Sequence, residues 1–232
     1  MERVGRRGAS QQIAGANWEV DEIPMIGDSV EATLVANKMT LFWAKLVWGL
    51  GVIGWFAIRH RHARRSRRTP KVTRDDPAWD RARLAFSLTG MCLIPGIYVF
   101  TGEPKFADYH FQPALAWAGA VTFALSLWLF YRTHKELGRN WSVTLEIREQ
   151  HTLVTSGVYR RVRHPMYSAF WLWALAQALL LPNWIAGPSG LVGFGILFFL
   201  RVHQEEELMI ETFGEDYRRY MARTSRILPG IY

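Results

Sequence analysis

The sequence contains one cysteine, Cys92, which lies inside an apolar block. One thiol excludes an intrachain disulfide and any metal site built from several cysteines, so Cys92 is predicted to be a buried packing residue. Residues 1–39 also lack the short apolar core behind a basic start that marks a cleavable signal peptide. Neither a disulfide framework nor a bound metal is therefore expected.

Acidic residues are in the minority, with 20 Asp and Glu against 28 Lys and Arg and a net charge of +8. A basic balance can indicate nucleic-acid binding, but here the basic residues gather at the edges of apolar blocks and no nucleic-acid motif accompanies them. The mean hydropathy of −0.02 averages very apolar blocks with very basic connectors. This separation is typical of an integral membrane protein. The expected partner is a lipid bilayer, and no nucleic acid is expected.

Five apolar blocks follow the polar leader 1–39, and each is interpreted as a transmembrane helix. About 20 residues, at about 1.5 Å each, cross about 30 Å of hydrocarbon. The predicted fold is all-α, a polytopic integral membrane protein with about five transmembrane helices. Three helices with a basic loop fill 40–131, and a core fills 132–232. The blocks are 40–58, 84–101, 113–131, 167–181 and 184–200.

The distribution of Lys and Arg predicts the topology. The segments 59–83, 132–166 and 201–232 carry ten, seven and five of them, whereas the connectors 102–112 and 182–188 carry one and none. The positive-inside rule places the three rich segments in the cytoplasm. The amino terminus is then outside, and the carboxyl terminus and any site beside it face the cytoplasm.

Glycine and proline inside the blocks are interpreted as packing and kinking residues. Gly49, Gly51 and Gly54 fit the dinucleotide fingerprint G-x-G-x-x-G, but that motif needs a strand before it and a helix after it. Here it lies inside a predicted span, where small residues allow close helix packing. Pro95 and Gly96 are predicted to kink the second span.

The polar segment 134–167 and the tail 201–232 hold the residues suited to chemistry. Pro165 fits the first turn of the fourth span, which places Arg163 and His164 at the membrane mouth of a helix. In the tail, Arg201 and Glu205 stand four residues apart on one helix face, where they can form an ion pair. The ends of consecutive hairpin helices lie close together, so these charges predict a charged pocket beside apolar helices. Such a pocket suits an amphiphilic ligand, and ionisable residues near the membrane plane indicate function.

These residues resemble the isoprenylcysteine carboxyl methyltransferase family and its relatives among phospholipid methyltransferases. The shared pattern is H-x-L-V-x-x-G-x-Y, then R-H-P-x-Y, an apolar hairpin, R-x-x-x-E-E and F-G-x-x-Y-x-x-Y. In this sequence the pattern falls on His151–Val154, Gly157, Tyr159, Arg163–Tyr167, Arg201, Glu205, Glu206, Phe213, Gly214, Tyr217 and Tyr220. The resemblance covers roughly residues 134–232.

The resemblance implies a membrane fold that binds S-adenosyl-L-methionine without a Rossmann domain, in a cytoplasmic pocket between the polar connector and the C-terminal segment. Glu205 would face the cationic methionine end of the cofactor, or pair with Arg201. Arg201, assisted by Arg163, would hold the substrate carboxylate as the catalytic clamp. The cofactor-binding residues that the resemblance implies are Thr144, His151, Thr152, Leu153, Val154, Tyr159, His164, Pro165, Met166, Tyr167 and Glu205.

The chemistry of the residues fits a carboxyl methyltransferase. A carboxylate is already ionised at neutral pH, so methyl transfer to it needs orientation and desolvation more than a strong base. An Arg holds a carboxylate in a fixed plane, which suits Arg201. A lipid group would lie between the fourth and fifth spans against Trp171, Trp173, Phe194 and Phe198. The expected function is S-adenosylmethionine-dependent methylation of a prenylated cysteine or a similar lipid-like acid.

Three other functions stay open at this point. Methylation of phospholipid amines needs a deprotonated nucleophile, and a carboxylate-orienting Arg201 does not help it. A steroid-reductase-like membrane enzyme would use NADPH in place of S-adenosylmethionine. A membrane scaffold with a vestigial site would bind the cofactor without turnover.

Overall fold

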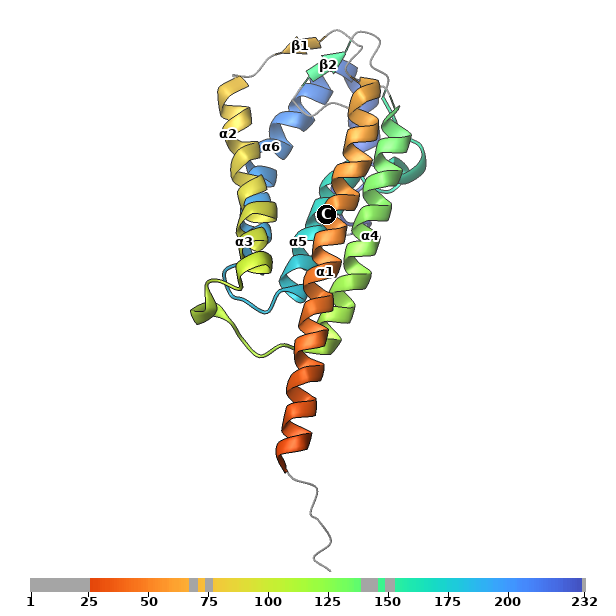
Figure 1. The fold of residues 1–232 in the computed structure, drawn as a ribbon. Helices are drawn as coiled ribbons and strands as arrows, with labels where there is room; N and C mark the ends of the chain where they lie inside the picture. The colour runs from red at the N-terminus through yellow and green to blue at the C-terminus, as the bar shows by residue number, and fades with distance from the viewer. Residues whose placement is uncertain (1–25, 67–70, 74–76, 139–145, 149–152, 231–232) are drawn as a thin grey trace, which may run out of the picture. The chain divides into compact units, whose positions relative to one another are not determined.

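The computed structural model describes the backbone of residues 26–66, 71–73, 77–138, 146–148 and 153–230, and the side chains within 40–62, 78–138 and 153–230. The chain divides into two compact units, Met1–Ala36 and Asn37–Tyr232, and the contacts below lie in the second. The regular elements of the described residues are helices apart from two short paired strands, which confirms the predicted all-α class (Figure 1). The main elements are α1 (Ile26–Ser66), β1 (Lys71–Thr73), α2 (Pro77–Leu88), α3 (Ile94–Thr101), α4 (Pro113–Leu137), β2 (Glu146–Arg148), α5 (Pro165–Leu180), α6 (Ser189–Phe213) and α7 (Glu215–Met221).

Three helical stretches within the described residues are long and apolar enough to cross a membrane: Thr40–His62, Ala78–Thr101 and Pro113–Leu137. They coincide with the first three predicted spans. Helix α5 has 16 residues, about 24 Å at about 1.5 Å per residue, which is shorter than a hydrocarbon core of about 30 Å. The total of five spans therefore stays a prediction.

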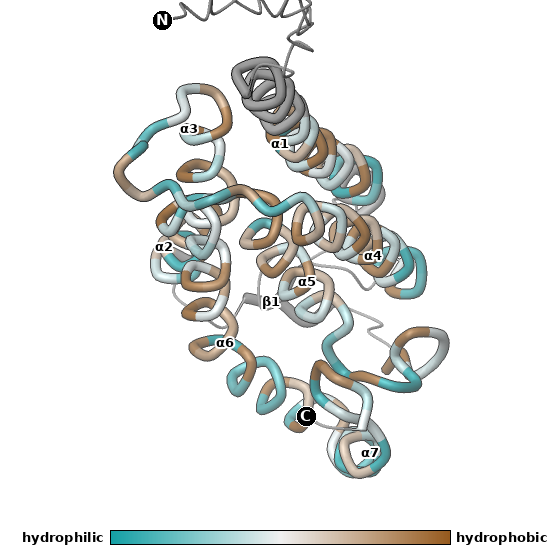
Figure 2. Tube along the Cα trace, turned by 90° about the horizontal axis from the view of Figure 1, so that it is seen from below, coloured by the Kyte–Doolittle hydropathy of each residue, from teal (hydrophilic) through white to brown (hydrophobic). Residues whose placement is uncertain are grey.

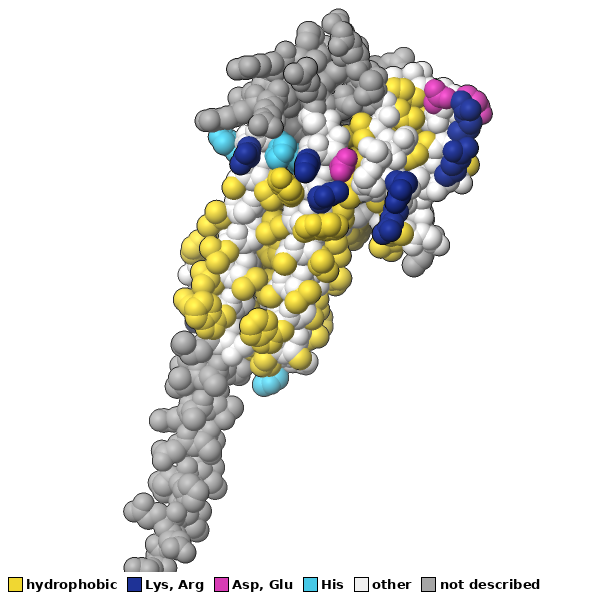
Figure 3. Space-filling model, turned by 90° about the vertical axis from the view of Figure 1, so that its right-hand side faces the viewer, with side chains coloured by type: hydrophobic (Ala, Val, Ile, Leu, Met, Phe, Trp, Pro, Cys, Tyr) yellow, Lys and Arg dark blue, Asp and Glu magenta, His cyan; other side chains and the backbone are white. Residues whose placement is uncertain are grey.

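The outer face of α4 has the side chains expected of a lipid-facing helix. Large apolar side chains are exposed along its length, among them Leu115, Trp117, Val121, Leu125 and Trp128. Figure 3 shows apolar side chains covering this side of the molecule, with Lys and Arg gathered at one end of the apolar surface and His at both ends. The basic residues thus border the apolar surface, as the positive-inside pattern requires.

Two helix ends follow the sequence pattern and one does not. Helix α4 ends at Leu137, and it is followed by Gly138, the residue type most common just past a helix end, with φ +52°. Pro165 occupies the first turn of α5, as predicted. The predicted start of the fifth span at residue 184 is wrong, because α6 begins at Ser189. The side-chain oxygen of Asn183 instead accepts hydrogen bonds from the backbone N–H groups of residues 185 and 186, which stabilises a turn there.

The second span contains a π-helical turn, Thr89–Leu93, directly before Pro95. The N–H of Ile94 donates to the carbonyl of Thr89, five residues earlier. Pro95 lacks an N–H and its ring crowds the preceding turn, so the wider turn accommodates it within a continuous helix. The predicted distortion at this proline is thus a π-helical turn between α2 and α3.

Close packing joins the helices. Helix α5 lies between α4 and α6, and α2 lies beside α6 (Figure 2). A Cβ atom on Gly51 of α1 would come within 2.4 Å of the Phe123 ring of α4, and one on Gly90 within 2.3 Å of the Ser189 carbonyl oxygen. Because lipid removes the hydrophobic drive between helices, van der Waals contact of this kind stabilises the bundle. The packing interpretation of Gly51 is confirmed.

Candidate active site

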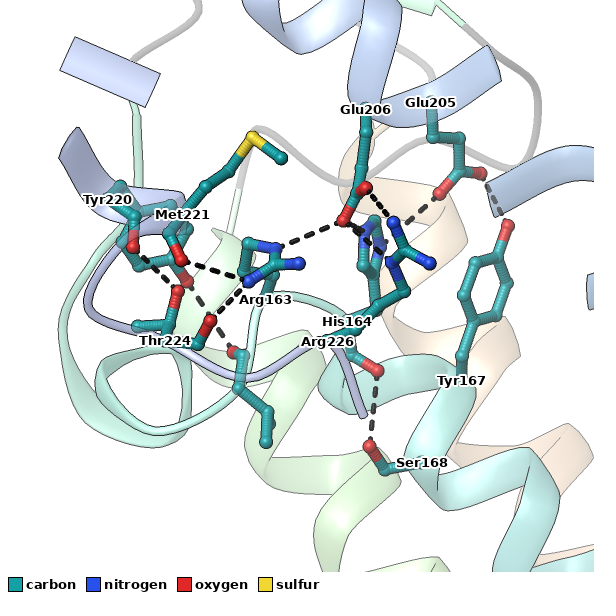
Figure 4. Close-up of polar contacts among 11 residues, drawn as sticks. Arg163, His164, Tyr167, Ser168, Glu205, Glu206, Tyr220, Met221, Thr224 and Arg226 are labelled. Carbon is teal, nitrogen blue, oxygen red and sulfur yellow. Dashed lines mark hydrogen bonds and ion pairs between the residues drawn. The ribbon is translucent and has the colours of Figure 1, made fainter. Parts of the chain in front are cut away.

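Charged side chains from α2, from the residues just before α5, from α6 and from the tail after α7 meet in one place, together with Tyr167 of α5, and we call this place the charged cluster. The residues before α5 and those in the second half of α6 face each other there, and Figure 4 shows most of the contacts. The helical period puts Arg201 and Glu205 on one face of α6, and Pro165 fixes the start of α5 just after His164. The members of the cluster are Asp80, Arg163, His164, Tyr167, Arg201, Glu205, Glu206 and Arg226.

Glu206 is the hub of one half of the charged cluster and is only 4% exposed. Arg163 donates to its carboxylate through Nε at 3.0 Å, and His164 Nε2 lies 3.2 Å from the same oxygen. Arg226 donates from two nitrogens, at 2.6 and 3.2 Å. Burial alone would raise the pKa of Glu206, but the hydrogen bonds from His164, Arg226 and Arg163 hold that pKa well below its usual range. Glu206 is therefore ionised at neutral pH.

Arg201 joins the remaining carboxylates of the charged cluster, those of Glu205 and Asp80, and is also buried. Its Nε lies 3.0 Å from a Glu205 carboxylate oxygen, and its NH1 nitrogen lies 3.4 Å from an oxygen of Asp80 on α2. Tyr167 donates to Glu205 at 2.6 Å, and His164 Nδ1 is 3.6 Å from the same carboxylate. The predicted ion pair between Arg201 and Glu205 is confirmed, and Asp80 joins it from another helix.

The ionised side chains of the charged cluster balance. Three arginines, at 163, 201 and 226, stand against three carboxylates, at 80, 205 and 206. Removing charges from water costs several kcal/mol each unless partners compensate them. A neutral cluster can stay buried at the membrane surface, and it can accept a cation and an anion together without a net charge.

The tail after α7 closes over the start of α5. The N–H groups of Arg163 and His164 donate to the carbonyls of Ser225 and Arg226 at 2.8 and 2.9 Å. Ser168 of α5 donates to the carbonyl of Ile227 at 2.6 Å. Backbone pairing between distant segments fixes the tail without depending on side-chain charge. It is this pairing that brings Arg226 to Glu206.

Helix α7 packs against the segment that precedes α5, next to the charged cluster. The hydroxyl of Tyr220 donates to the carbonyl of Tyr159 at 2.6 Å, and both side chains are buried. Burial raises the pKa of Tyr220 to about 12, so its hydroxyl keeps the proton it donates. Arg218 and Arg219 point to the exposed side and pair with Glu215 and Asp216. Helix α7 therefore packs against the protein with its tyrosines and exposes its charged residues.

Some of the residues predicted to bind the cofactor lie outside the described residues, and the others lie in several different places. Thr144, His151 and Thr152 lie outside the described residues. Leu153, Val154 and Met166 are half-buried, Pro165 is buried, and Tyr159 belongs to a 3-10 turn, Gly157–Arg160. Of the nominated residues, His164, Tyr167 and Glu205 contact one another in the charged cluster. Their roles toward a cofactor stay predictions.

The aromatic residues proposed to surround a lipid group divide between two faces of α5. Trp171 packs against Phe194 and Phe198 of α6, with ring centroids 5.3 and 5.8 Å away. Trp173 instead packs against Trp55 of α1 and Phe123 of α4, at 5.3 and 5.6 Å. Placing Trp173 between the fourth and fifth spans was therefore wrong. The two tryptophans are two positions apart on a helix, and residues so spaced point to different sides.

Sequence reasoning missed Asp80 and Arg226. Asp80 stands among basic residues at the start of the second span, and such a position is typical of a solvent-exposed residue at the edge of a membrane helix. Arg226 follows a run of polar tail residues with no periodicity. The acidic position of Asp80 in the first turn of α2 was the available signal, because that position favours a carboxylate through the helix dipole.

Comparison with known proteins finds similarity over the segment that carries most of the charged cluster. The family model for the isoprenylcysteine carboxyl methyltransferase (ICMT) family matches residues 121–211. This segment of the chain is therefore similar to the isoprenylcysteine carboxyl methyltransferase family, and the chain spans about half the length, or less, of the relatives that follow. It is 29% identical over 136 residues to the protein-S-isoprenylcysteine O-methyltransferase of Dictyostelium discoideum, covering 54% of this chain and 56% of that one. It is 39% identical over 92 residues to the Homo sapiens enzyme of the same name, covering 40% of this chain and 32% of that one.

A solved structure of the eukaryotic intramembrane Ras methyltransferase is similar to this chain with a TM-score of 0.45 and 23% identity, over 69% of this chain and 55% of that one. That likeness is too distant to carry a conclusion. The matched family segment includes Arg163, His164, Arg201, Glu205 and Glu206. It does not include Asp80 or the tail. Part of the charged cluster thus comes from outside the segment that matches the family.

The charged cluster has features that fit a cationic methyl donor. Glu205 has the most open of the three carboxylates, with its side chain 23% exposed against 5% for Glu206 and Asp80. The rings of His164 and Tyr167 stack beside it, with centroids 5.5 Å apart and planes inclined by 21°. A carboxylate next to an aromatic face is the set of groups that attracts an ammonium or sulfonium. Glu205, His164 and Tyr167 are therefore suited to hold the methionine end of such a molecule.

Proposed function

We propose that this protein is a membrane methyltransferase that uses S-adenosyl-L-methionine to methylate the carboxylate of a prenylated cysteine or a similar lipid-like acid. The observation that carries the proposal is the place of Arg201. Its guanidinium is buried in a charge-balanced cluster, on a helix whose preceding turns are apolar and aromatic. An acid with a lipid tail also has a charged end next to an apolar chain, so its carboxylate can pair with Arg201 while its tail lies along the apolar turns of α6. Similarity of residues 121–211 to the isoprenylcysteine carboxyl methyltransferase family supports a methyl-transfer reaction at this site.

The residues present can carry out the protein's share of this reaction. When bound, the cofactor supplies a methyl group on a cationic sulfur. Arg201 holds the acid and fixes the plane of its oxygens, and Arg163 is the second arginine available in the charged cluster. Glu205, with His164 and Tyr167, holds the cationic end of the cofactor. Because the acid is ionised before it binds, none of these residues has to remove a proton.

The binding of both reactants is consistent with the charge of the site. S-adenosylmethionine carries a net charge of about +1 at neutral pH, and the acid carries about −1. Added together to the neutral charged cluster, they leave it neutral, whereas either one alone leaves it charged. The methylated product has lost its charge, so its hold on Arg201 is weaker than that of the acid, which favours release.

The lipid group is proposed to lie along Trp171. The indole N–H of Trp171 is buried and has no hydrogen-bond partner among the described side chains and backbone groups. A buried Trp N–H usually finds a partner, so a polar group of the substrate beside the lipid chain is a suitable acceptor. The neighbouring Phe199 is 63% exposed and contacts Trp171 at a ring-centroid distance of 6.5 Å. The substrate would therefore enter sideways from the bilayer.

The site is proposed to face the cytoplasm, with the carboxyl terminus on the same side. The basic residues at the end of the apolar surface support this orientation (Figure 3). Reporter domains fused to the two ends test it together with the span count. Five spans place the ends on opposite sides, and ends on the same side would contradict the proposed topology.

A direct test is transfer of a labelled methyl group from S-adenosylmethionine to a prenylcysteine analogue in membranes that contain the protein. The same membranes are offered a phospholipid with a free amine, and binding of NADPH is compared with binding of S-adenosylmethionine. Labelled ester with the acid and none with the amine supports the proposal. Absence of ester with every amphiphilic acid, together with no binding of S-adenosylmethionine, overturns it.

A further inference from the structure

Asp80 is a buried carboxylate whose role the family segment does not assign. Its side chain is 5% exposed, and it lies in the first turn of α2, outside residues 121–211. Its contact is the 3.4 Å ion pair with NH1 of Arg201, and neither of its oxygens accepts a hydrogen bond from the described residues. A buried carboxylate with so little compensation costs stability. A structural role alone does not account for that cost.

The geometry of Arg201 shows what Asp80 does. Glu205 holds the Nε side of the guanidinium and Asp80 lies against NH1. A guanidinium is planar, so two anions at two different nitrogens fix both its position and its plane. Glu205 fixes the guanidinium at Nε. Asp80, from another helix, adds a contact at a second nitrogen, which restricts rotation about the first.

We propose that Asp80 is a positioning residue for methyl transfer, which sets the plane in which Arg201 presents the acid. The inference rests on the proposed function of Arg201 as the carboxylate clamp. Asp80 also supplies one of the three negative charges of the charged cluster. Without it the cluster carries one excess positive charge, which strengthens its attraction for an anion while leaving that anion badly oriented.

The competing explanation is that Asp80 only docks α2 against α6. The chain offers a control for it, because Arg83 of α2 also donates to Gln204 of α6 at 3.1 Å. Removing Gln204 breaks a polar link between the same two helices without contact to Arg201. If Asp80 acts by docking alone, the variants Asp80→Asn and Gln204→Ala have the same kinetic effect.

The experiment measures methyl transfer by the full chain in membranes, with a prenylcysteine acid varied at saturating S-adenosylmethionine. For Asp80→Asn we expect kcat to fall by about 10- to 100-fold, since misplacement of a reacting group has effects of this size. The KM for the acid is expected to be unchanged or lower. Gln204→Ala is expected to keep both constants near those of the unaltered protein. Equal effects of the two variants, or a raised KM with unchanged kcat in Asp80→Asn, overturn the proposal.

A second measurement separates this inference from the proposed function. Thermal unfolding of Asp80→Asn, Arg201→Met and the double variant gives their coupling without any substrate. Coupling supports the contact, and additive effects overturn the inference even if methyl transfer is found. If the unaltered protein methylates no acid while the coupling is present, it is the proposed function that fails. Should Asp80→Asn not fold, Asp80→Glu keeps the charge, and a wild-type kcat in that variant overturns the positioning role.

Discussion

Arg226, in the tail that follows α7, donates two hydrogen bonds to the buried carboxylate of Glu206 on α6, at 2.6 and 3.2 Å. The contact joins the end of the described chain to the helix that carries Arg201. Arg163 and His164 reach the same carboxylate from the start of α5. Glu206 therefore connects the tail, α5 and α6 through one side chain.

Replacement of Arg226 by Met is expected to lower the free energy of unfolding by about 2 kcal/mol, because hydrogen bonds to a buried charge are lost. Thermal unfolding in detergent measures the change. Arg218→Met is the control, since its ion pair with Glu215 is exposed and such pairs contribute less than about 1 kcal/mol. Equal losses of stability in the two variants would show that the contact with Glu206 stabilises the protein no more than an exposed ion pair does.

Acid is expected to destabilise the protein through Glu206. The pKa of this carboxyl is lower in the folded than in the unfolded state, so its contribution is fully present above the unfolded value of about 4.3. That contribution is lost as the pH falls from about 4.3 toward the lower folded value. Unfolding measured between neutral pH and acid tests this. Glu206→Gln should be less stable at pH 7 and should lose less stability on acidification, and an unchanged acid response in that variant would contradict the assignment.

Substitution of Gly157 by Ala is expected to destabilise the connector. Gly157 has φ +59°, and a Cβ there would lie 2.4 Å from the carboxyl carbon of Glu136. Left-handed backbone costs a non-glycine residue about 1–2 kcal/mol, and displacement of Glu136 adds to that cost. Gly138→Ala has the same type of strain, with φ +52° and nothing within 4 Å. Unfolding should therefore show Gly157→Ala as the more destabilised variant, and Glu136→Ala should reduce the difference.

Replacement of Arg201 and replacement of His164 are expected to impair methyl transfer in different ways. Arg201→Ala should lower kcat for methyl transfer by about 100-fold or more through lost orientation of the acid, with a smaller effect on binding of S-adenosylmethionine. His164→Ala should weaken cofactor binding. Equilibrium binding and steady-state kinetics on both variants distinguish the two roles, and the reverse pattern would overturn the assignment.

Trp171 offers a test of where the lipid group lies. Trp171→Leu should raise the KM for a long-chain prenylcysteine acid more than the KM for a short-chain one, because only the long chain loses apolar contact. Trp117→Leu is the matched control, since Trp117 is 72% exposed on α4. A change in KM that does not depend on chain length would place the lipid elsewhere.

Local sequence patterns predicted most of the helices and most residues of the charged cluster. Apolar length located the three spans, Gly138 marked the end of α4, and Pro165 marked the start of α5. The four-residue spacing of Arg201 and Glu205 predicted their ion pair, because both lie on one helix and the helical period alone brings them together. Motif spacing also predicted the similarity to the family whose model matches residues 121–211.

Tertiary structure alone decided which distant residues complete the charged cluster and which face of α5 each tryptophan occupies. Asp80 reaches Arg201 because α2 packs on α6, and Arg226 reaches Glu206 because the tail pairs with the backbone before α5. Trp173 faces α1 and α4 for the same kind of reason. Periodicity describes one element at a time, whereas the partner of a buried charge depends on how separate elements pack.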